Sequence, residues 1–162
     1  MDVFKVASYI YSRYEQEFGS RIDEMKLHKL MYFAQRESLI QRDEPLFDTP
    51  FQAWKYGPVI PQIRSRYKQG TLTETVSSQE IEPYKAIFDK IFEKYAPEDA
   101  WSLSSITHGE RSWQKARRGI PVGENGSVFI DIADIREDAK YIKQRRFLLS
   151  KLQPAYQSAT PV

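Results

Sequence analysis

The side chains that could do acid–base or metal chemistry are few and widely spaced in this sequence. There are two histidines, His28 and His108, and neither belongs to the H-E-x-x-H pattern that places two zinc ligands on one helix face. His28 lies close to Lys26 and Lys29, so we interpret it as a surface or boundary residue rather than a metal ligand. The chain has no cysteine, which excludes disulfides, thiolate nucleophiles and cysteine-bound zinc.

Acidic pairs occur at Asp43/Glu44 and Glu98/Asp99, but neighbouring acids in a chain with 28% charged residues usually lie on solvated faces. Nothing marks either pair as a general acid and base, because no candidate nucleophile or partner group accompanies them. The sequence also has no nucleophile elbow, no Walker loop and no G-x-G-x-x-G cradle. We therefore predict a protein that is not an enzyme and that binds no cofactor or metal ion.

Basic residues gather in two places, which raises the alternative of nucleic-acid binding. The first group is Arg111, Lys115, Arg117 and Arg118, and the second is Lys140, Lys143, Arg145, Arg146 and Lys151. Beside Trp113 and Tyr141, such residues could meet phosphates and stacked bases. Acidic residues interleave with them, however, and the net charge is only +2. A solvated helix with ion pairs one turn apart is the favoured interpretation.

Two segments have the composition of a recognition surface. Residues 54–58 read W-K-Y-G-P, a turn that combines aromatic and cationic groups, and Trp and Tyr are over-represented at binding hot spots. Residues 107–113 end a predicted helix in a polar corner that holds Trp113. A structural role is the alternative there: Thr107 or His108 would bond a neighbouring backbone group, and Trp113 would fill the core.

Caps and apolar spacing predict the helices that must position these segments. The first runs from an N-cap at Asp2 to residue 18, and the second from about residue 23 to residue 41. The second should bury one stripe, made of Leu27, Leu30, Met31 and Ala34. Further helices are expected over residues 61–70, 83–96, 98–107 and 131–152, with a loop at 71–78 and a short basic turn or helix at 112–118. The last helix is expected to bury Ile132, Ile135, Ala139, Ile142, Leu149 and Leu152.

The helical period is lost after the second helix, where we predict a small β element. Residues 45–47 and 51–54 have the pattern of two extended pieces around a turn at 48–50. The large apolar residues of this region are expected in the core; they are Phe33, Leu46, Phe47, Phe51 and Trp54. The predicted fold class is mainly α, a compact single-domain helical bundle with a small antiparallel β element around residues 45–56.

The length of 162 residues favours one domain, which we expect to span residues 1–152, followed by a flexible C-terminal tail at 153–162. The N-terminal segment carries charges throughout and has no apolar signal-peptide core. No run approaches the roughly 20 apolar residues of a membrane span. We therefore expect a cytoplasmic protein without a membrane partner.

Two motifs, in this order, resemble one known family. The segments K-L-H-K-L-M-Y-F-A-Q at residues 26–35 and F-x-A-W-K-Y-G-P-V-x-P at residues 51–61 are similar to the signature of the Panacea domain, the phage-associated SocA-like antitoxin family. Thr107-His108 followed by W-Q-K-A-R at residues 113–117 is similar to its T-H…P-W-x-x-A-R segment. Ser112 departs from the pattern, because the family often has proline there. The resemblance spans residues 3–149.

The resemblance implies an antitoxin from a bacterial or phage toxin–antitoxin system, which neutralises a protein toxin by direct binding. It implies neither catalysis nor a cofactor. The positions that match its motifs are Lys29, Trp54, Lys55, Tyr56, Gly57, Pro58, Thr107, His108, Trp113 and Arg117. Each could contact the toxin or hold the fold, and we favour the fold for Gly57, Pro58, Thr107 and Trp113. Two other functions stay open: a nucleic-acid-binding regulator that uses the basic last helix, and an adaptor that delivers its partner to a protease.

Overall fold

The computed structural model describes residues 1–157, with side chains through Leu152. The elements are α1 (Val3–Phe18), α2 (Glu24–Arg42), β1 (Gln52–Trp54), β2 (Gly57–Val59), α3 (Pro61–Gln69), α4 (Ser78–Ile81), η1 (Glu82–Tyr84), α5 (Lys85–Lys94), α6 (Ala100–His108), α7 (Arg111–Ala116) and α8 (Ile132–Gln157). Helices dominate, and the described strands form one two-stranded antiparallel sheet. The predicted fold class is confirmed.

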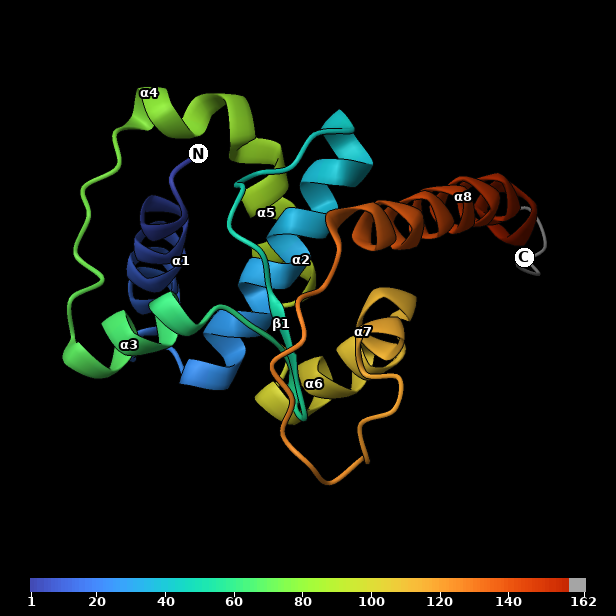
Figure 1. Ribbon diagram of the computed structural model, residues 1–162. Helices are drawn as coiled ribbons and strands as arrows, with labels where there is room; N and C mark the ends of the chain where they lie inside the picture. The colour runs from blue at the N-terminus through green and yellow to red at the C-terminus, as the bar shows by residue number, and fades with distance from the viewer. Residues whose placement is uncertain (158–162) are drawn as a thin grey trace.

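Helix α2 forms the centre of the molecule, and α1, α5, α6, α8 and the hairpin pack around it (Figure 1). The predicted stripe of Leu27, Leu30, Met31 and Ala34 is buried, but so is every other residue from Lys26 to Ile40. A helix that is enclosed on all faces must bury its polar side chains too. The expectation that His28 lies at the surface was therefore wrong, since His28 is only 2% exposed.

Aspartate side chains cap three of the helices, and the cap at Asp2 was predicted. Asp2 accepts hydrogen bonds from the N–H groups of Phe4 and Lys5, and Asp23 accepts one from Lys26. Asp99 caps α6 in the same way. In the segment predicted as a loop over 71–78, a short helix α4 begins at its last residue. Ser77 and Glu80 form a capping box there, a spacing that the sequence displays and that could have revealed this helix.

The hairpin lies further along the chain than expected. Gln52 pairs with Val59, Ala53 with Pro58 and Trp54 with Gly57, so the turn is Lys55-Tyr56 and not residues 48–50. The piece at 45–47 is not a strand, because the buried amide of Gln35 bonds its backbone. That amide accepts from the N–H of Leu46 (2.7 Å) and donates to the carbonyl of Phe47 (2.8 Å). Of the large apolar residues predicted in the core, Trp54 alone is only half-buried.

Residues 128–130 run beside β1, as the N–H of Ala53 donates to the carbonyl of Val128 and the N–H of Ile130 donates to that of Phe51, each at 2.8 Å. Gln52 and Phe129 form an isolated antiparallel bridge. This short third piece connects the loop after α7 to the start of α8. Strand β1 and residues 128–130 are thus hydrogen-bonded, although Ala53 and Val128 lie 75 residues apart in sequence.

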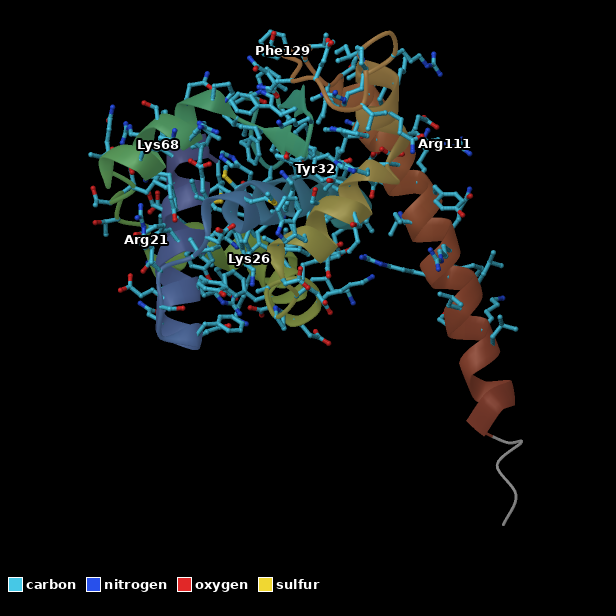
Figure 2. All side chains as sticks on the ribbon, turned by 90° about the horizontal axis from the view of Figure 1, so that it is seen from below. Arg21, Lys26, Tyr32, Lys68, Arg111 and Phe129 are labelled. Atoms are coloured by element: carbon cyan, nitrogen blue, oxygen red, sulfur yellow. The ribbon has the colours of Figure 1, made fainter. Side chains whose placement is uncertain are left out.

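Helix α8 begins against α2 and α7 and then extends beyond the other helices (Figures 1 and 2). Of its predicted buried stripe, Ile135 and Ala139 are buried and Ile142 is half-buried, whereas Ile132, Leu149 and Leu152 are exposed. The prediction failed for Leu149 and Leu152 because the outer half of the helix leaves the body, whereas Ile132 is exposed at the first position of α8. The predicted tail begins at residue 153, yet α8 continues through Gln157; residues 158–162 lie outside the described part of the chain.

Within residues 1–157, no helix combines the length and the apolar character that crossing a bilayer requires.

Candidate functional site

The motif residues predicted from the sequence converge on one region, which we call the hairpin corner. It comprises the hairpin turn at residues 54–58, the end of α6 and helix α7 through Arg117, with Lys29 of α2 beneath it. Figure 1 shows the tip of the hairpin against α6, and α7 next to them. Segments that are remote in sequence therefore form one site, and most of its side chains hold the segments together.

Gly57 is the tightest point of the hairpin corner. It has φ +117°, and a Cβ added there would lie 2.5 Å from Lys29 Cε and 2.6 Å from Thr107 Oγ1. Lys29 Nζ donates to the carbonyl of Pro58 at 3.2 Å, and Thr107 Oγ1 donates to that of Ser104 at 2.7 Å. Only glycine fits between these two buried side chains, which agrees with the structural role favoured for Gly57, Pro58 and Thr107.

The burial of α2 on all faces also shifts the pKa values of two of its side chains, Lys29 and His28. Burial lowers the pKa of Lys29 to about 7, although Asp23 and Glu24 oppose the shift. Burial also lowers the pKa of its neighbour His28 to about 3, with Lys29 and Arg64 adding to the effect. Within the described residues, neither ring nitrogen of His28 has a hydrogen-bond partner. The ring is thus held neutral in an apolar setting.

Trp113 joins α7 to the hairpin, since its indole N–H donates to the carbonyl of Trp54 at 2.9 Å. The His108 ring stacks on Trp113 with 4.3 Å between ring centroids. Burial lowers the pKa of His108, and the backbone of Lys55 opposes this shift. Thr107 bonds a neighbouring backbone carbonyl, as the structural alternative expects, whereas Trp113 is half-buried against the core rather than within it.

Arg117 is buried and donates hydrogen bonds to backbone carbonyls that come before and after it in the sequence. Its guanidinium donates to the carbonyl of Ala53 at 3.0 Å and to that of Pro121 at 3.2 Å. It thereby ties the loop after α7 to β1. This residue, which the sequence placed in a basic cluster, is only 6% exposed.

The exposed part of the hairpin corner is aromatic. Tyr56 and Trp101 meet edge to face with 5.3 Å between centroids, and Lys55 Nζ lies 4.9 Å from the centre of the Tyr56 ring. Ser104 fixes this turn, because its hydroxyl donates to the carbonyl of Tyr56 at 2.7 Å. Trp101 was missed in the sequence, although it falls off the α6 face that buries Leu103 and Thr107. The position of Trp101 two residues before Leu103, off this buried face, could have indicated an exposed tryptophan.

A second, buried polar cluster lies next to the hairpin corner and was not predicted. Arg36 of α2 forms an ion pair with Glu110 and donates to Tyr95 Oη at 2.6 Å. Burial and Asp138 raise the pKa of Glu110 to about 7, while Arg36 opposes the shift. The cluster links α2 to the end of α5 and the start of α7, because Arg36 lies 59 residues before Tyr95 and 74 residues before Glu110.

Ser112, the departure from the family pattern, belongs to this cluster. Its hydroxyl lies 2.9 Å from Tyr32 Oη, and its N–H donates to Asp138 at 3.0 Å. Asp138 also accepts from the N–H of Arg111 at 3.2 Å, so it caps α7 from α8. Proline has no N–H, and serine here makes two buried hydrogen bonds that proline would not make.

Several members of the two basic groups are engaged within the fold, although Arg111, Lys140 and Arg145 line one groove. Arg117 is internal, Lys115 pairs with Asp134 at 3.0 Å, and Arg146 makes a two-pronged pair with the buried Glu37 at 2.8 and 3.0 Å. The nucleic-acid alternative therefore loses residues that it needs. For residues 1–152, whose side chains are described, the structure contains no group of three or more His, Asp or Glu side chains placed to hold a metal ion.

Comparison with known proteins assigns the class. The family model described as "Antitoxin SocA-like, Panacea domain" matches residues 27–114, a span that begins in α2 and ends in α7. The chain belongs to this family, and the resemblance found in the sequence is confirmed. The match is shorter than the span of 3–149 expected, since it leaves out α1 and α8.

A particular relative is Antitoxin SocA of Caulobacter vibrioides (strain NA1000 / CB15N), which is 43% identical over 42 residues. That alignment covers 26% of this chain and 22% of the relative, so it spans about a fifth of that antitoxin's length. No solved structure matches the chain. Both the family description and the name of this relative refer to antitoxins.

Proposed function

We propose that this protein is an antitoxin that neutralises a protein toxin by binding it directly. The observation that carries the proposal is the aromatic pair at the hairpin corner, in which Tyr56 is 45% exposed and Trp101 is 61% exposed. Large aromatic side chains that stay in contact with water on a rigid frame are typical of binding hot spots. Membership in the SocA-like antitoxin family supports the same function.

The frame around this pair is rigid because its neighbours are bonded from several elements. Ser104 holds the backbone of Tyr56, Trp113 holds that of Trp54, and Lys29 holds that of Pro58. A surface that is ordered before binding loses little conformational entropy when a partner arrives. We therefore assign partner contact to Trp54, Lys55 and Tyr56, with Trp101 added to them.

The other matching positions hold the fold. Lys29, Gly57, Pro58, Thr107, Trp113 and Arg117 are assigned this role, and His108 supports Trp113 through its stacked ring. Their bonds go to the hairpin, to α6 and to the loop after α7. Substitution of these residues should weaken binding only to the extent that it unfolds the protein.

The test is to express this protein together with the products of its neighbouring genes. We expect one neighbour to stop growth when expressed alone, to be harmless with this protein, and to co-purify with it in a stable complex. The proposal is overturned if no neighbour is toxic, or if the toxic neighbour is rescued without forming a complex. Degradation of the bound neighbour by a protease would identify the adaptor function instead.

Matched variants test the assigned surface. Tyr56→Ala and Trp101→Ala should each weaken the complex by about tenfold or more, as expected for a hot spot. Phe18→Ala is the control, because Phe18 is a stacked aromatic residue of similar exposure at the far end of α1. Equal affinity of all three variants would remove the aromatic pair from the interface.

A further inference from the structure

An open groove of about 690 Å³ separates the start of α8 from the ends of α5 and α6. Its walls include Lys94 and Ile106 on one side and Tyr141 and Arg145 on the other. The Arg36–Glu110 pair lies at its base. The groove shares the end of α6 and the first residue of α7 with the hairpin corner, but none of residues 54–58 lines it. The antitoxin proposal above makes no use of it.

The wall formed by α8 continues past the groove as an apolar stripe. Tyr141, Arg145, Leu148 and Leu152 follow one another at i, i+4, i+7 and i+11, so they share one face of the helix. We call these four residues the α8 seam. Tyr141, Leu148 and Leu152 are 61%, 61% and 64% exposed, respectively. Figure 2 shows this half of α8 clear of the body, with no element covering it.

Basic residues outnumber acidic ones in this region. The groove lining contains five basic side chains and three acidic ones, which are Arg36, Lys94, Arg111, Lys140 and Arg145 against Glu110, Glu137 and Asp138. Of the five basic residues between 139 and 152, Lys140 pairs with Glu137 and Arg146 with Glu37, and the other three have no ion-pair partner within residues 1–152. On the opposite wall, Lys94 has no ion-pair partner within residues 1–152. Burial lowers the pKa of Lys94, and Arg146 and Arg36 add to this shift. The groove and the α8 seam therefore combine apolar contact area with a surplus of positive charge.

We propose that the groove and the α8 seam hold a helix of the toxin whose apolar face is flanked by carboxylates. This inference rests on the proposed antitoxin function and names the part of the toxin that is bound. A helix fits because the seam repeats with helical spacing and opens into a channel between helices. Carboxylates fit because they would meet Arg145 from one wall and Lys94 from the other.

Two other occupants fit the same surface less well. A second copy of this chain would bring two sets of five basic residues together, and like charges at an interface are costly. A flat anionic membrane could reach the outer end of α8, but Tyr141 and Arg145 face into the groove. A protein helix reaches both the groove and the seam.

The test uses the toxic neighbour from the experiment above, purified as an inactive variant, and measures its affinity for variants of this chain. Leu148→Asp and Arg145→Glu should each weaken binding by about tenfold or more. Phe147→Asp and Lys143→Glu are matched controls, because these residues lie on the opposite face of the same exposed half of α8. The controls should bind within about twofold of the unchanged protein.

A cross-link locates the occupant directly. Tyr141→p-benzoylphenylalanine should cross-link to one helix of the toxin on illumination, whereas the same photoreactive group at Phe147 should not. Mass spectrometry would identify the captured segment. We expect a segment with apolar residues at helical spacing and with acidic residues on either side of them.

The outcomes separate this inference from the proposed function. If the unchanged protein binds no toxic neighbour, both proposals fail. If it binds the toxin, and the seam variants bind as well as their controls, the groove inference alone is overturned. It is also overturned if Leu148→Asp leaves toxin binding intact but abolishes a dimer in light scattering or the binding of anionic vesicles.

Discussion

Gly57 lies where three segments meet, and its lack of a side chain allows them to pack closely. Its neighbours Lys29 and Thr107 come from α2 and α6, and both are buried. The hydrogen atom of glycine leaves the space that the lysine stem and the threonine hydroxyl occupy. The hairpin corner therefore depends on the absence of a side chain at this position as much as on the presence of its aromatic residues.

We predict that Gly57→Ala lowers the free energy of unfolding by about 3 kcal/mol, since the added methyl meets two buried side chains at a positive φ. Thermal or urea denaturation measures the change. Gly70→Ala is the matched control, because Gly70 has φ +68° but nothing within 4 Å of the added Cβ. Its cost should be near 1 kcal/mol, set by the backbone angle alone. Equal costs for the two variants would contradict the packing argument.

The buried amine of Lys29 makes a pH-dependent contribution. Its pKa is about 7 in the folded protein and near 10.5 in the unfolded chain, so between these values the unfolded chain alone holds the proton. Stability should therefore rise with pH across this window, by up to about 1.4 kcal/mol per pH unit from this group.

Lys29→Met should flatten that dependence. The measurement is the free energy of unfolding at several pH values from neutral to alkaline, compared with the unchanged protein. Lys68→Met, at an exposed position of α3, is the control and should keep the full slope. If Lys29→Met keeps the slope as well, the buried amine is charged in the folded state.

At the scale of elements, helix α7 depends on a cap from another helix. Asp138 of α8 accepts from two N–H groups in the first turn of α7, and Ser112 adds the bond to Tyr32. We expect Ser112→Ala to cost about 1 kcal/mol and Ser112→Pro at least about 2 kcal/mol, because only proline also removes the N–H donor. Chemical denaturation gives both values.

A double-mutant cycle isolates the cap. In an Asp138→Ala background the difference between Ser112→Pro and Ser112→Ala should shrink, because the acceptor of the N–H is already gone. An unchanged difference would mean that proline acts through backbone strain. The same cycle would show what the serine at this position contributes beyond the proline common in the family.

Helix ends and the hairpin differ in how far they could be predicted, and the reason is physical. Asp2, Asp23 and Asp99 cap through bonds to residues two or three positions away, so their effect is visible in a short window of sequence. The strand predicted at residues 45–47 does not form because Gln35 bonds this piece of backbone, and Gln35 lies more than ten residues before it. No local pattern in residues 45–56 reveals that an amide from α2 replaces a strand partner.

The candidate site shows the same division. The motif residues at the hairpin corner were found because the resemblance named them, and Trp101 could have been found from its place off the buried face of α6. The Arg36–Glu110 pair could not, since its partners are 74 residues apart and each looks like an ordinary surface charge. The burial of His28 was missed for a related reason: enclosure of α2 on all sides is a property of the whole fold.

At the scale of the whole molecule, one ion pair connects α8 to α2 at the point where the outer half of α8 extends beyond the other helices. Arg146 donates two hydrogen bonds to the buried Glu37, while the next two residues, Phe147 and Leu148, are exposed. Burial raises the pKa of Glu37, but the bonds from Arg146 and Gln41 outweigh it, so the pKa falls overall. The pair is thus the last strong contact before the helix becomes free of the core.

We predict that Arg146→Met lowers the free energy of unfolding by about 2 kcal/mol, because it leaves a buried carboxylate without its cation. Hydrogen exchange of α8 should also become faster from residue 140 onward. Lys143→Met, one turn away and exposed, should change neither quantity. Adding Glu37→Gln to Arg146→Met should recover part of the stability; no recovery would show that the arginine acts through its hydrophobic stem.

The enclosure of α2 has a consequence for synthesis of the protein. This helix leaves the ribosome before the residues that complete its surroundings, since Ile135, Ala139 and Arg146 follow its last residue, Arg42, by 93 to 104 positions. Until then its arginine and carboxylate side chains lack their partners, and its apolar residues lack part of their cover. A chain that stops before residue 146 should therefore expose the unpaired groups of α2 and be a substrate for proteolysis. Under the proposed antitoxin function, only copies that extend past this residue would protect the cell.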